Sequence, residues 1–199
     1  MRRGLLLSLG VLPIVLLVAC GTRSDRAVAD PRVGKVFYLC CNIHFDQQKP
    51  EITDAIPSQG TLIPFGTRVE VQKVTKDTVR FEAAGHPPIT LAYDHGSKAM
   101  PFGRYLGYLF VSDDPRLKLK KVPARQVKLI EKSTVAPGMS RDQVVMALGY
   151  PPGDRTPSLE SSTWTYLPGS GETLVVYFDG GRVSSVQRRA GAHAPRKSD

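Results

Sequence analysis

The sequence predicts an α+β protein with two regions in series. Residues 33–121 carry short stretches of alternating apolar and polar residues between turn signals, which is typical of a small β-barrel or β-sandwich. Residues 122–189 carry two short helical patterns followed by three strand patterns, and two helices on one face of a three-stranded antiparallel sheet would bury both apolar faces. With 199 residues, 41% of them hydrophobic, the chain is long enough to form a hydrophobic core.

The N-terminus has the plan of a secretory signal. Two arginines precede an uncharged, mostly apolar run over residues 4–19, which is shorter than the ~20 residues that a membrane-spanning helix needs. Leu17-Val18-Ala19-Cys20 matches the lipobox of bacterial lipoproteins, in which the cysteine is acylated. We therefore expect residues 1–19 to be a signal peptide and Cys20 to carry S-diacylglycerol and N-palmitoyl groups. The alternative is an ordinary signal anchor in which Cys20 is incidental.

The residues after the lipobox predict where the chain lies. Gly21 stands where an aspartate would resemble an inner-membrane retention signal, so we expect an outer-membrane lipoprotein that faces the periplasm. Residues 20–32 are polar and aperiodic, as in a flexible tether. The formal net charge of +9 favours contact with an anionic membrane surface, although charges of this kind are usually solvated surface. Nucleic acid is not expected as a partner of an exported chain.

The region 33–121 is predicted to contain five or six short strands. The sequence of residues 62–81, LIPFGTRVEVQKVTKDTVRF, resembles a bacterial SH3-type barrel, in which a turn precedes strands that enclose a hairpin. The last strand is predicted at Tyr105–Val111, where apolar residues on both faces indicate a fully buried strand. The other expected strands lie at residues 35–43, 61–63, 67–74, 78–82 and 89–93.

The region 122–189 begins after a charged segment over residues 112–121. This segment is predicted to be a linker or an edge strand. A first helix is predicted over residues 123–132, with Pro123 in its first turn. A second helix follows Ser140, because Ser140 and Gln143 have the spacing of a capping box. Gly149 is placed to end this helix in a left-handed conformation, and the two prolines that follow prevent its continuation.

Three strands are predicted at the end of the chain, over residues 162–167, 173–178 and 182–187. Asp179-Gly180-Gly181 is a strong hairpin signal between the last two. Residues 190–199 are rich in Ala, Gly, Pro and basic residues and are expected to form a disordered tail.

The second region carries a set of motif residues: Gly138, Met139, Ser140, Gly149, Pro151, Trp164, Tyr166, Phe178 and Gly180. Over about residues 123–188 this set resembles the SmpA/OmlA family, the BamE-like lipoprotein domain, and its residues are structural motif positions of that family. The resemblance implies two helices followed by three antiparallel strands, and a non-enzymatic role as an accessory lipoprotein of the outer-membrane β-barrel assembly machinery that touches protein partners and anionic lipid. The chain departs from the family by its additional β-rich region, and the same domain shape also occurs in secreted inhibitors.

No constellation of residues in the sequence predicts catalysis, a metal or a cofactor. Cys40 and Cys41 are expected to be two buried apolar side chains, because a disulfide between neighbours needs a strained ring; such a bridge or intermolecular pairing is the alternative. Cys40 and His44 are too few ligands for a metal. Asp94-His95 is explained by a turn. An envelope enzyme would require the fold to bring Cys40 or Cys41 next to His86 or His95.

Two surface features are candidates for interactions. Trp164 is expected in the core of the second region or, alternatively, as an exposed aromatic anchor of a protein interface. A basic run could meet lipid phosphates or an acidic partner, or it is a solvated linker; its residues are Arg116, Lys118, Lys120, Lys121, Arg125 and Lys128. The functions we expect are a binding scaffold of the cell envelope, with possible membership of the assembly machinery, or a peptidoglycan- or ligand-binding module that uses residues 33–121.

Overall fold

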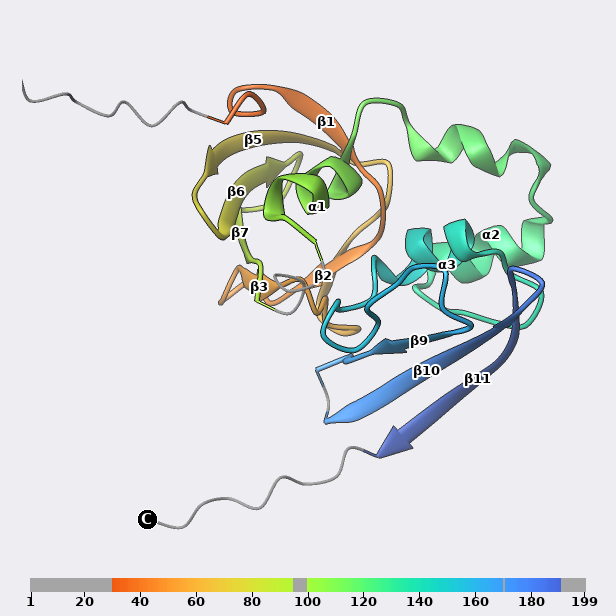
Figure 1. The fold of residues 1–199 in the computed structure, drawn as a ribbon. Helices are drawn as coiled ribbons and strands as arrows, with labels where there is room; N and C mark the ends of the chain where they lie inside the picture. Colours follow the sequence, from red (N-terminus) through yellow and green to blue (C-terminus); the bar gives the residue numbers. More distant parts are fainter. Residues whose placement is uncertain (1–29, 95–99, 170, 191–199) are drawn as a thin grey trace, which may run out of the picture.

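A computed structural model describes residues 30–94, 100–169 and 171–190 of the chain, which fold as an α+β protein (Figure 1). The α+β class is confirmed. Cys20, His95, the expected signal peptide and residues 191–199 of the expected tail lie outside the described residues. The strands form a six-stranded sheet in the order β3-β7-β6-β5-β1-β8, a two-stranded sheet β2-β4 and a three-stranded sheet β11-β10-β9.

The first region holds both the six-stranded and the two-stranded sheet. Val69 and Val71 of one strand and Val79 and Phe81 of the next are buried, whereas the residues between them are exposed, so the predicted alternation is confirmed. Figure 1 shows the larger sheet curving around this apolar face. Its strands are β1 (Val36–Leu39), β3 (Glu51–Thr53), β5 (Arg68–Val74), β6 (Thr78–Ala83), β7 (Ile89–Ala92) and β8 (Phe110–Val111).

The strand expected at residues 35–43 is interrupted. β1 ends at Leu39, and β2 (Ile43–Phe45) begins after a bend over residues 40–42 and pairs with β4 (Thr61–Ile63) in the smaller sheet. The backbone N–H of Asn42 donates to the carbonyl of Met146, 2.9 Å away in the second region. At this bend the chain therefore departs from the six-stranded sheet and contacts the second region.

The buried strand predicted at Tyr105–Val111 is wrong for most of its length. Residues Phe102–Leu109 form helix α1, and only the last two residues of the predicted strand form β8. A short apolar run fits a buried helix as well as a buried strand. Here Tyr105, Leu106 and Leu109 face the core at helical spacing, while Tyr108 remains 36% exposed.

The segment 112–121 is neither an edge strand nor an irregular linker. Residues Pro115–Lys121 form a 3-10 helix, η1, that starts at Asp114, whose side chain accepts a hydrogen bond from the N–H of Arg116. The predicted first helix follows directly as α2 (Ala124–Glu131), preceded by Pro123.

The second region follows its prediction closely. Helix α3 (Arg141–Leu148) begins with the capping box that the sequence predicts: Ser140 Oγ accepts from the N–H of Gln143, and the Gln143 side chain accepts from the N–H of Ser140 at 2.8 Å. The sheet consists of β9 (Thr163–Tyr166), β10 (Glu172–Asp179) and β11 (Arg182–Ala190). Gly180 and Gly181 both have positive φ, as a two-residue hairpin of this type requires.

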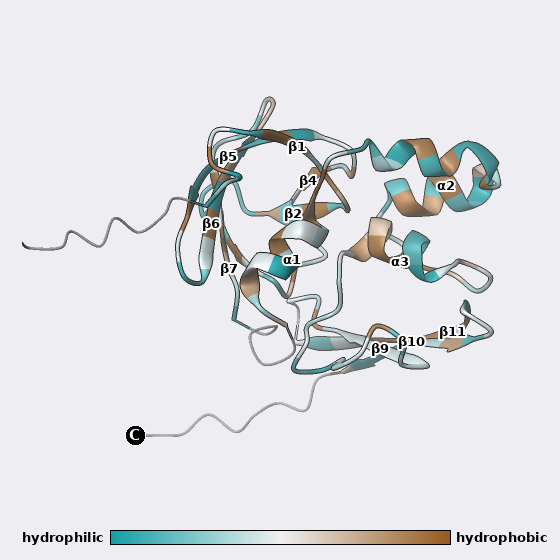
Figure 2. Cartoon of the chain, turned by 45° about the horizontal axis from the view of Figure 1, so that its top comes forward, coloured by the Kyte–Doolittle hydropathy of each residue, from teal (hydrophilic) through white to brown (hydrophobic). Residues whose placement is uncertain are grey.

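The two regions share one hydrophobic core. The same cluster of buried residues runs from Leu39 and Phe81 in the first region to Val144 and Trp164 in the second. In Figure 2, α3 carries apolar residues and lies between the first region and the three-stranded sheet. The chain is therefore a single packed unit, in which each region covers apolar surface of the other.

Candidate functional site

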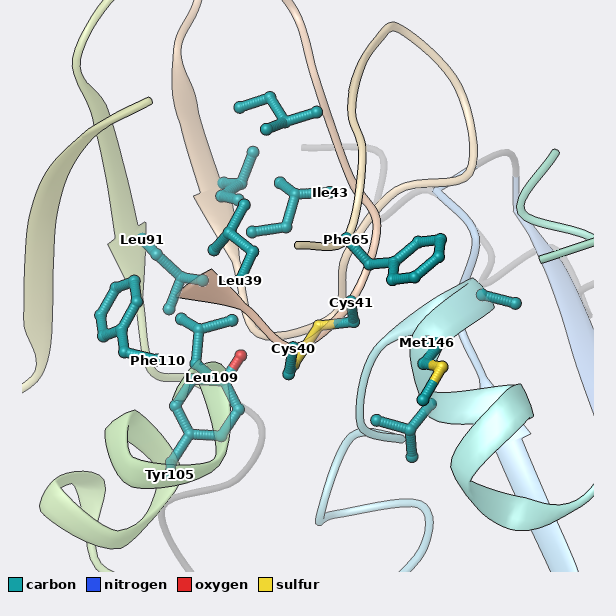
Figure 3. Packing of buried hydrophobic residues seen from close by; sticks show 14 of the residues in the cluster. Leu39, Cys40, Cys41, Ile43, Phe65, Leu91, Tyr105, Leu109, Phe110 and Met146 are labelled. Atoms are coloured by element: carbon teal, nitrogen blue, oxygen red, sulfur yellow. A yellow bond between two sulfur atoms is a disulfide. The ribbon is translucent and has the colours of Figure 1, made fainter. Parts of the chain in front are cut away.

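The bend at residues 40–42 carries a feature that the sequence analysis disfavoured. Cys40 and Cys41 are joined as a disulfide between adjacent residues, and both are buried. Figure 3 shows the pair between the side chains of the first region and Met146 of α3. The expected burial of both side chains is confirmed, and the bridge between neighbours, which the sequence analysis gave as the alternative, is present because the chain bends here and is not an extended strand.

Trp164 lies in the core, as expected, and the alternative of an exposed anchor is wrong. Its side chain is only 1% exposed, so it is a core residue and not an aromatic anchor on the surface. Its indole N–H donates to the carbonyl of Leu159 at 3.2 Å, and its ring packs edge-on against Phe178. The guanidinium of Arg141 lies 4.5 Å from the centre of the Phe178 ring and covers this pair from the solvent side.

The remaining motif residues organise the helix and its sheet. Met139 is fully buried, and the N–H of Gly138 donates to the carbonyl of Val183 at 2.8 Å. Tyr166 donates its hydroxyl to the carbonyl of Gly149 at 3.1 Å, and burial raises its pKa well above the usual value, which keeps this donor protonated. Pro151 is buried directly behind this helix end.

The basic run remains on the surface, but its charges are not equivalent. Arg116 forms an ion pair with Asp114 at 2.6 Å, and the hydrogen bond from Arg116 holds the pKa of Asp114 below its usual value. Lys118, Lys120 and Lys121 are exposed. Leu117 lies among them with 58% of its surface exposed. The three lysines and Leu117 are called the η1 patch below. Arg125 and Lys128, on α2, are also exposed.

A cavity that the sequence analysis missed lies between the two regions. It has a volume of about 180 Å3, and its walls come from the bend and β2, the end of α2, the end of α3 and the three-stranded sheet. Its polar lining includes Asn42, His44, Ser58, Ser133 and Arg188. Its apolar lining includes Ile56, Leu148, Leu174 and Val186.

A chain of hydrogen bonds lies in the wall of this cavity. The Nε2 atom of His44 is 2.8 Å from Ser133 Oγ, and Asn42 donates from Nδ2 to the same oxygen at 3.0 Å. Burial lowers the pKa of His44, and the backbone of Gly60 offsets part of this effect. The Nδ1 atom is buried and makes no hydrogen bond of standard geometry with the described residues.

Sequence spacing does not reveal this group, because His44 and Ser133 are 89 residues apart. The one available signal is Ser133 itself, which follows a predicted helix at a place where glycine is the usual residue. The contact between cysteine and histidine that would have indicated an enzyme is not observed: the ring of His86 packs against Phe45, and His95 lies outside the described residues.

The described residues contain no cluster of three or more His, Cys, Asp or Glu side chains that could hold a metal ion, and no helix long and apolar enough to cross a membrane. Comparison with protein-family models, with curated proteins and with solved structures finds no match to this chain. The resemblance to the SmpA/OmlA family therefore stays a prediction from the sequence motifs.

Proposed function

We propose that this chain is an outer-membrane lipoprotein, anchored through Cys20 and facing the periplasm, that acts as a binding scaffold. Its second region would be a BamE-like domain and its first region an SH3-like module. The observation that supports a scaffold is the burial of the motif side chains Met139, Trp164 and Tyr166. Because these residues stabilise the interior of the domain, residues on its outer surface are available to bind a partner.

The η1 patch is the surface we assign to the anionic membrane. A lysine close to an anionic surface contributes about 1 kcal/mol, and an exposed leucine among lysines adds apolar surface that can enter the headgroup layer. Lys118 and Lys121 have this arrangement around Leu117 on η1. Arg116 contributes less, because Asp114 already neutralises it.

Lipidation is tested first. Cys20→Ser should abolish labelling by a fatty-acid probe and leave the unprocessed precursor in the cell. Labelling that is unchanged in this variant would remove the anchor from the proposal.

The membrane role of the η1 patch is tested with the non-acylated chain and vesicles that contain phosphatidylglycerol. Replacing Lys118, Lys120 and Lys121 by Gln should weaken co-sedimentation by about a hundredfold, since each charge contributes about 1 kcal/mol. The matched control replaces three exposed lysines of the first region, Lys35, Lys73 and Lys76. Equal loss in both triple variants would show a general charge effect and contradict the assignment.

Membership of the β-barrel assembly machinery is the narrower part of the proposal. Crosslinking of the lipidated protein in envelopes, followed by affinity purification, should recover subunits of that machinery. Recovery of the bait without any of them would remove this part and leave the anchored scaffold.

A second candidate function is peptidoglycan or ligand binding by the first region. It is favoured by an open groove of about 680 Å3 whose lining is rich in amide and charged side chains, as carbohydrate and peptide ligands require. The groove includes Asp46, Gln47, Gln48, Lys49 and Glu51. Sedimentation with purified peptidoglycan tests it: a Gln47→Ala, Gln48→Ala variant should lose binding that the η1 triple variant retains.

A further inference from the structure

Ser133 occupies a backbone conformation that its side chain disfavours. Its φ is 51°, and within residues 30–94, 100–169 and 171–190 no other residue except glycine has a positive φ. It ends α2 in a Schellman turn: the N–H of Ser133 donates to Ile130 and that of Thr134 donates to Leu129, both at 2.9 Å. Glycine fits this position without strain, so the turn alone does not explain why the residue is a serine.

The hydrogen bonds around the hydroxyl indicate that reason. Asn42 is 1% exposed, and its Oδ1 accepts from the N–H of Phe65 at 2.9 Å, which identifies the other atom as the amide nitrogen. That nitrogen donates to Ser133 Oγ. The serine oxygen is therefore an acceptor towards Asn42, and its own hydrogen is available to Nε2 of His44, 2.8 Å away.

His44 is suited to receive this proton. Its pKa is lowered by burial, so the ring is neutral at physiological pH and Nε2 can act as a base. A nucleophilic hydroxyl within hydrogen-bond distance of a histidine is the arrangement by which enzymes activate serine. The pair lines a cavity, so a reacting carbonyl group has a place to lie beside it.

The cavity limits what could bind. An apolar cavity of about 150 Å3 is sufficient for one benzene molecule, and this one has about 180 Å3 with apolar walls from Leu148, Leu174 and Val186. A short acyl chain fits these walls. Arg188 lies in the lining, is exposed and forms an ion pair with Glu172 at 3.5 Å. Its guanidinium could contact the alcohol part of an ester whose acyl part occupies the cavity.

We propose that Ser133 and His44 form an acyl-transfer site that hydrolyses esters of short acyl chains. Ser133 Oγ bonds to the ester carbonyl carbon as its proton passes to Nε2 of His44, the carbon–oxygen bond to the alcohol breaks, and the alcohol oxygen takes that proton. Water then attacks the acyl-serine, His44 accepts its proton and returns it to Ser133 Oγ, and the carboxylic acid leaves. Asn42 Nδ2 donates one hydrogen to the carbonyl of Ile130 at 2.6 Å, so the hydrogen that it directs to Ser133 Oγ is the one that can turn to the oxyanion forming beside that atom.

This site is independent of the membrane and scaffold roles proposed above. The first test treats the folded full-length protein with a fluorophosphonate probe and locates the label by peptide mass spectrometry. We expect the label on Ser133, its loss in Ser133→Gly, which suits the positive φ, and retention in the control Ser184→Gly, an exposed serine bonded to Tyr177 O. A folded protein with no label, or with label on another residue, overturns the proposal.

A second test does not depend on finding the substrate. In Ser133→Cys, a neighbouring His44 should lower the pKa of the new thiol, so alkylation by iodoacetamide should persist below pH 7. The double variant Ser133→Cys, His44→Gln should need a pH near the usual thiol range, around 8.5, for the same rate. Identical pH profiles for the two variants would show that the histidine does not activate this position. For p-nitrophenyl butyrate, His44→Gln should lower kcat/KM by about hundredfold.

Discussion

The two helices of the second region end in different ways, although both ends contact the first region. Helix α3 ends at Gly149, where φ is 80° and ψ is −174°, and helix α2 ends at Ser133, where φ is 51°. At the first position a β-carbon would lie 2.8 Å from Cδ1 of Ile56, so it fits only if the end of the Ile56 side chain moves. At the second position the side chain makes the contact, through its hydroxyl.

This comparison separates packing from chemistry. Gly149 lets the chain leave α3 in an extended direction, a conformation that is nearly restricted to glycine. Ser133 keeps a hydroxyl beside His44 and Asn42 at a cost in backbone energy. Ser133 lines the cavity, and Gly149 directly follows Leu148, which also lines it. Variants at the two positions therefore show whether this part of the molecule contributes only to the free energy of unfolding or also to a reaction.

The largest effect is expected for Gly149→Ala. The unfavourable φ costs about 1–3 kcal/mol. The contact with Cδ1 of Ile56 adds a smaller cost, because this atom is the end of a flexible side chain that can move. Denaturant unfolding should show a total loss of about 3 kcal/mol. Gly180→Ala is the matched control, because its φ is also positive but a β-carbon there meets nothing within 4 Å. Adding Ile56→Val should recover part of the loss; equal losses for Gly149→Ala and Gly180→Ala would contradict the clash.

The next effect is a difference between two substitutions of Ser133. Ser133→Ala keeps the unfavourable φ and loses hydrogen bonds to Asn42 and His44, so it should cost about 2 kcal/mol. Ser133→Gly loses the same bonds but relieves the backbone by about 1 kcal/mol. Glycine should therefore be the more stable variant by thermal or denaturant unfolding. An alanine variant as stable as the glycine variant would mean that the positive φ is not strained.

The boundaries of α3 and the last hairpin show what the sequence alone could predict. The capping box at Ser140, the positive φ at Gly149 and the hairpin at Gly180 were predicted, because each depends on residues only a few positions apart. The prediction for Gly149 was incomplete, since its ψ is extended and not left-handed. Ile56 and Cys41 of the first region lie beside this glycine, and neither contact can be read from the local sequence.

The predictions failed for elements that depend on distant pairing and for one short apolar run. Strand β3 is a polar three-residue segment that pairs in parallel with β7, about forty residues away, and it carries no periodic signal. The helix α1 was mistaken for a strand because its apolar run is short. The hydrogen bond between His44 and Ser133 joins two regions whose packing could not be derived from either region separately.

A smaller effect is expected at the start of α3. Ser140→Ala removes the hydrogen bond from the N–H of Gln143 and should cost about 1 kcal/mol. Ser140→Thr keeps the cap and should be close to wild type. Ser184→Ala is the surface control, because Ser184 caps no helix. If Ser140→Ala loses no stability in chemical unfolding, the capping box does not stabilise α3, and the end at Gly149 becomes the more important boundary of this helix.

The smallest change is expected in the pH dependence of stability. Burial lowers the pKa of His44 below the ordinary value of 6.5, so the unfolded chain binds a proton at a higher pH than the folded chain does. The stabilising contribution of neutral His44 is therefore complete above about pH 6.5 and is lost as the pH falls below it. The comparison of wild type with His44→Gln between pH 7.5 and 5 should show a steeper decline in the wild type. A decline of equal slope would mean that His44 titrates as an exposed residue, and Nε2 would then not be held as the neutral acceptor beside Ser133.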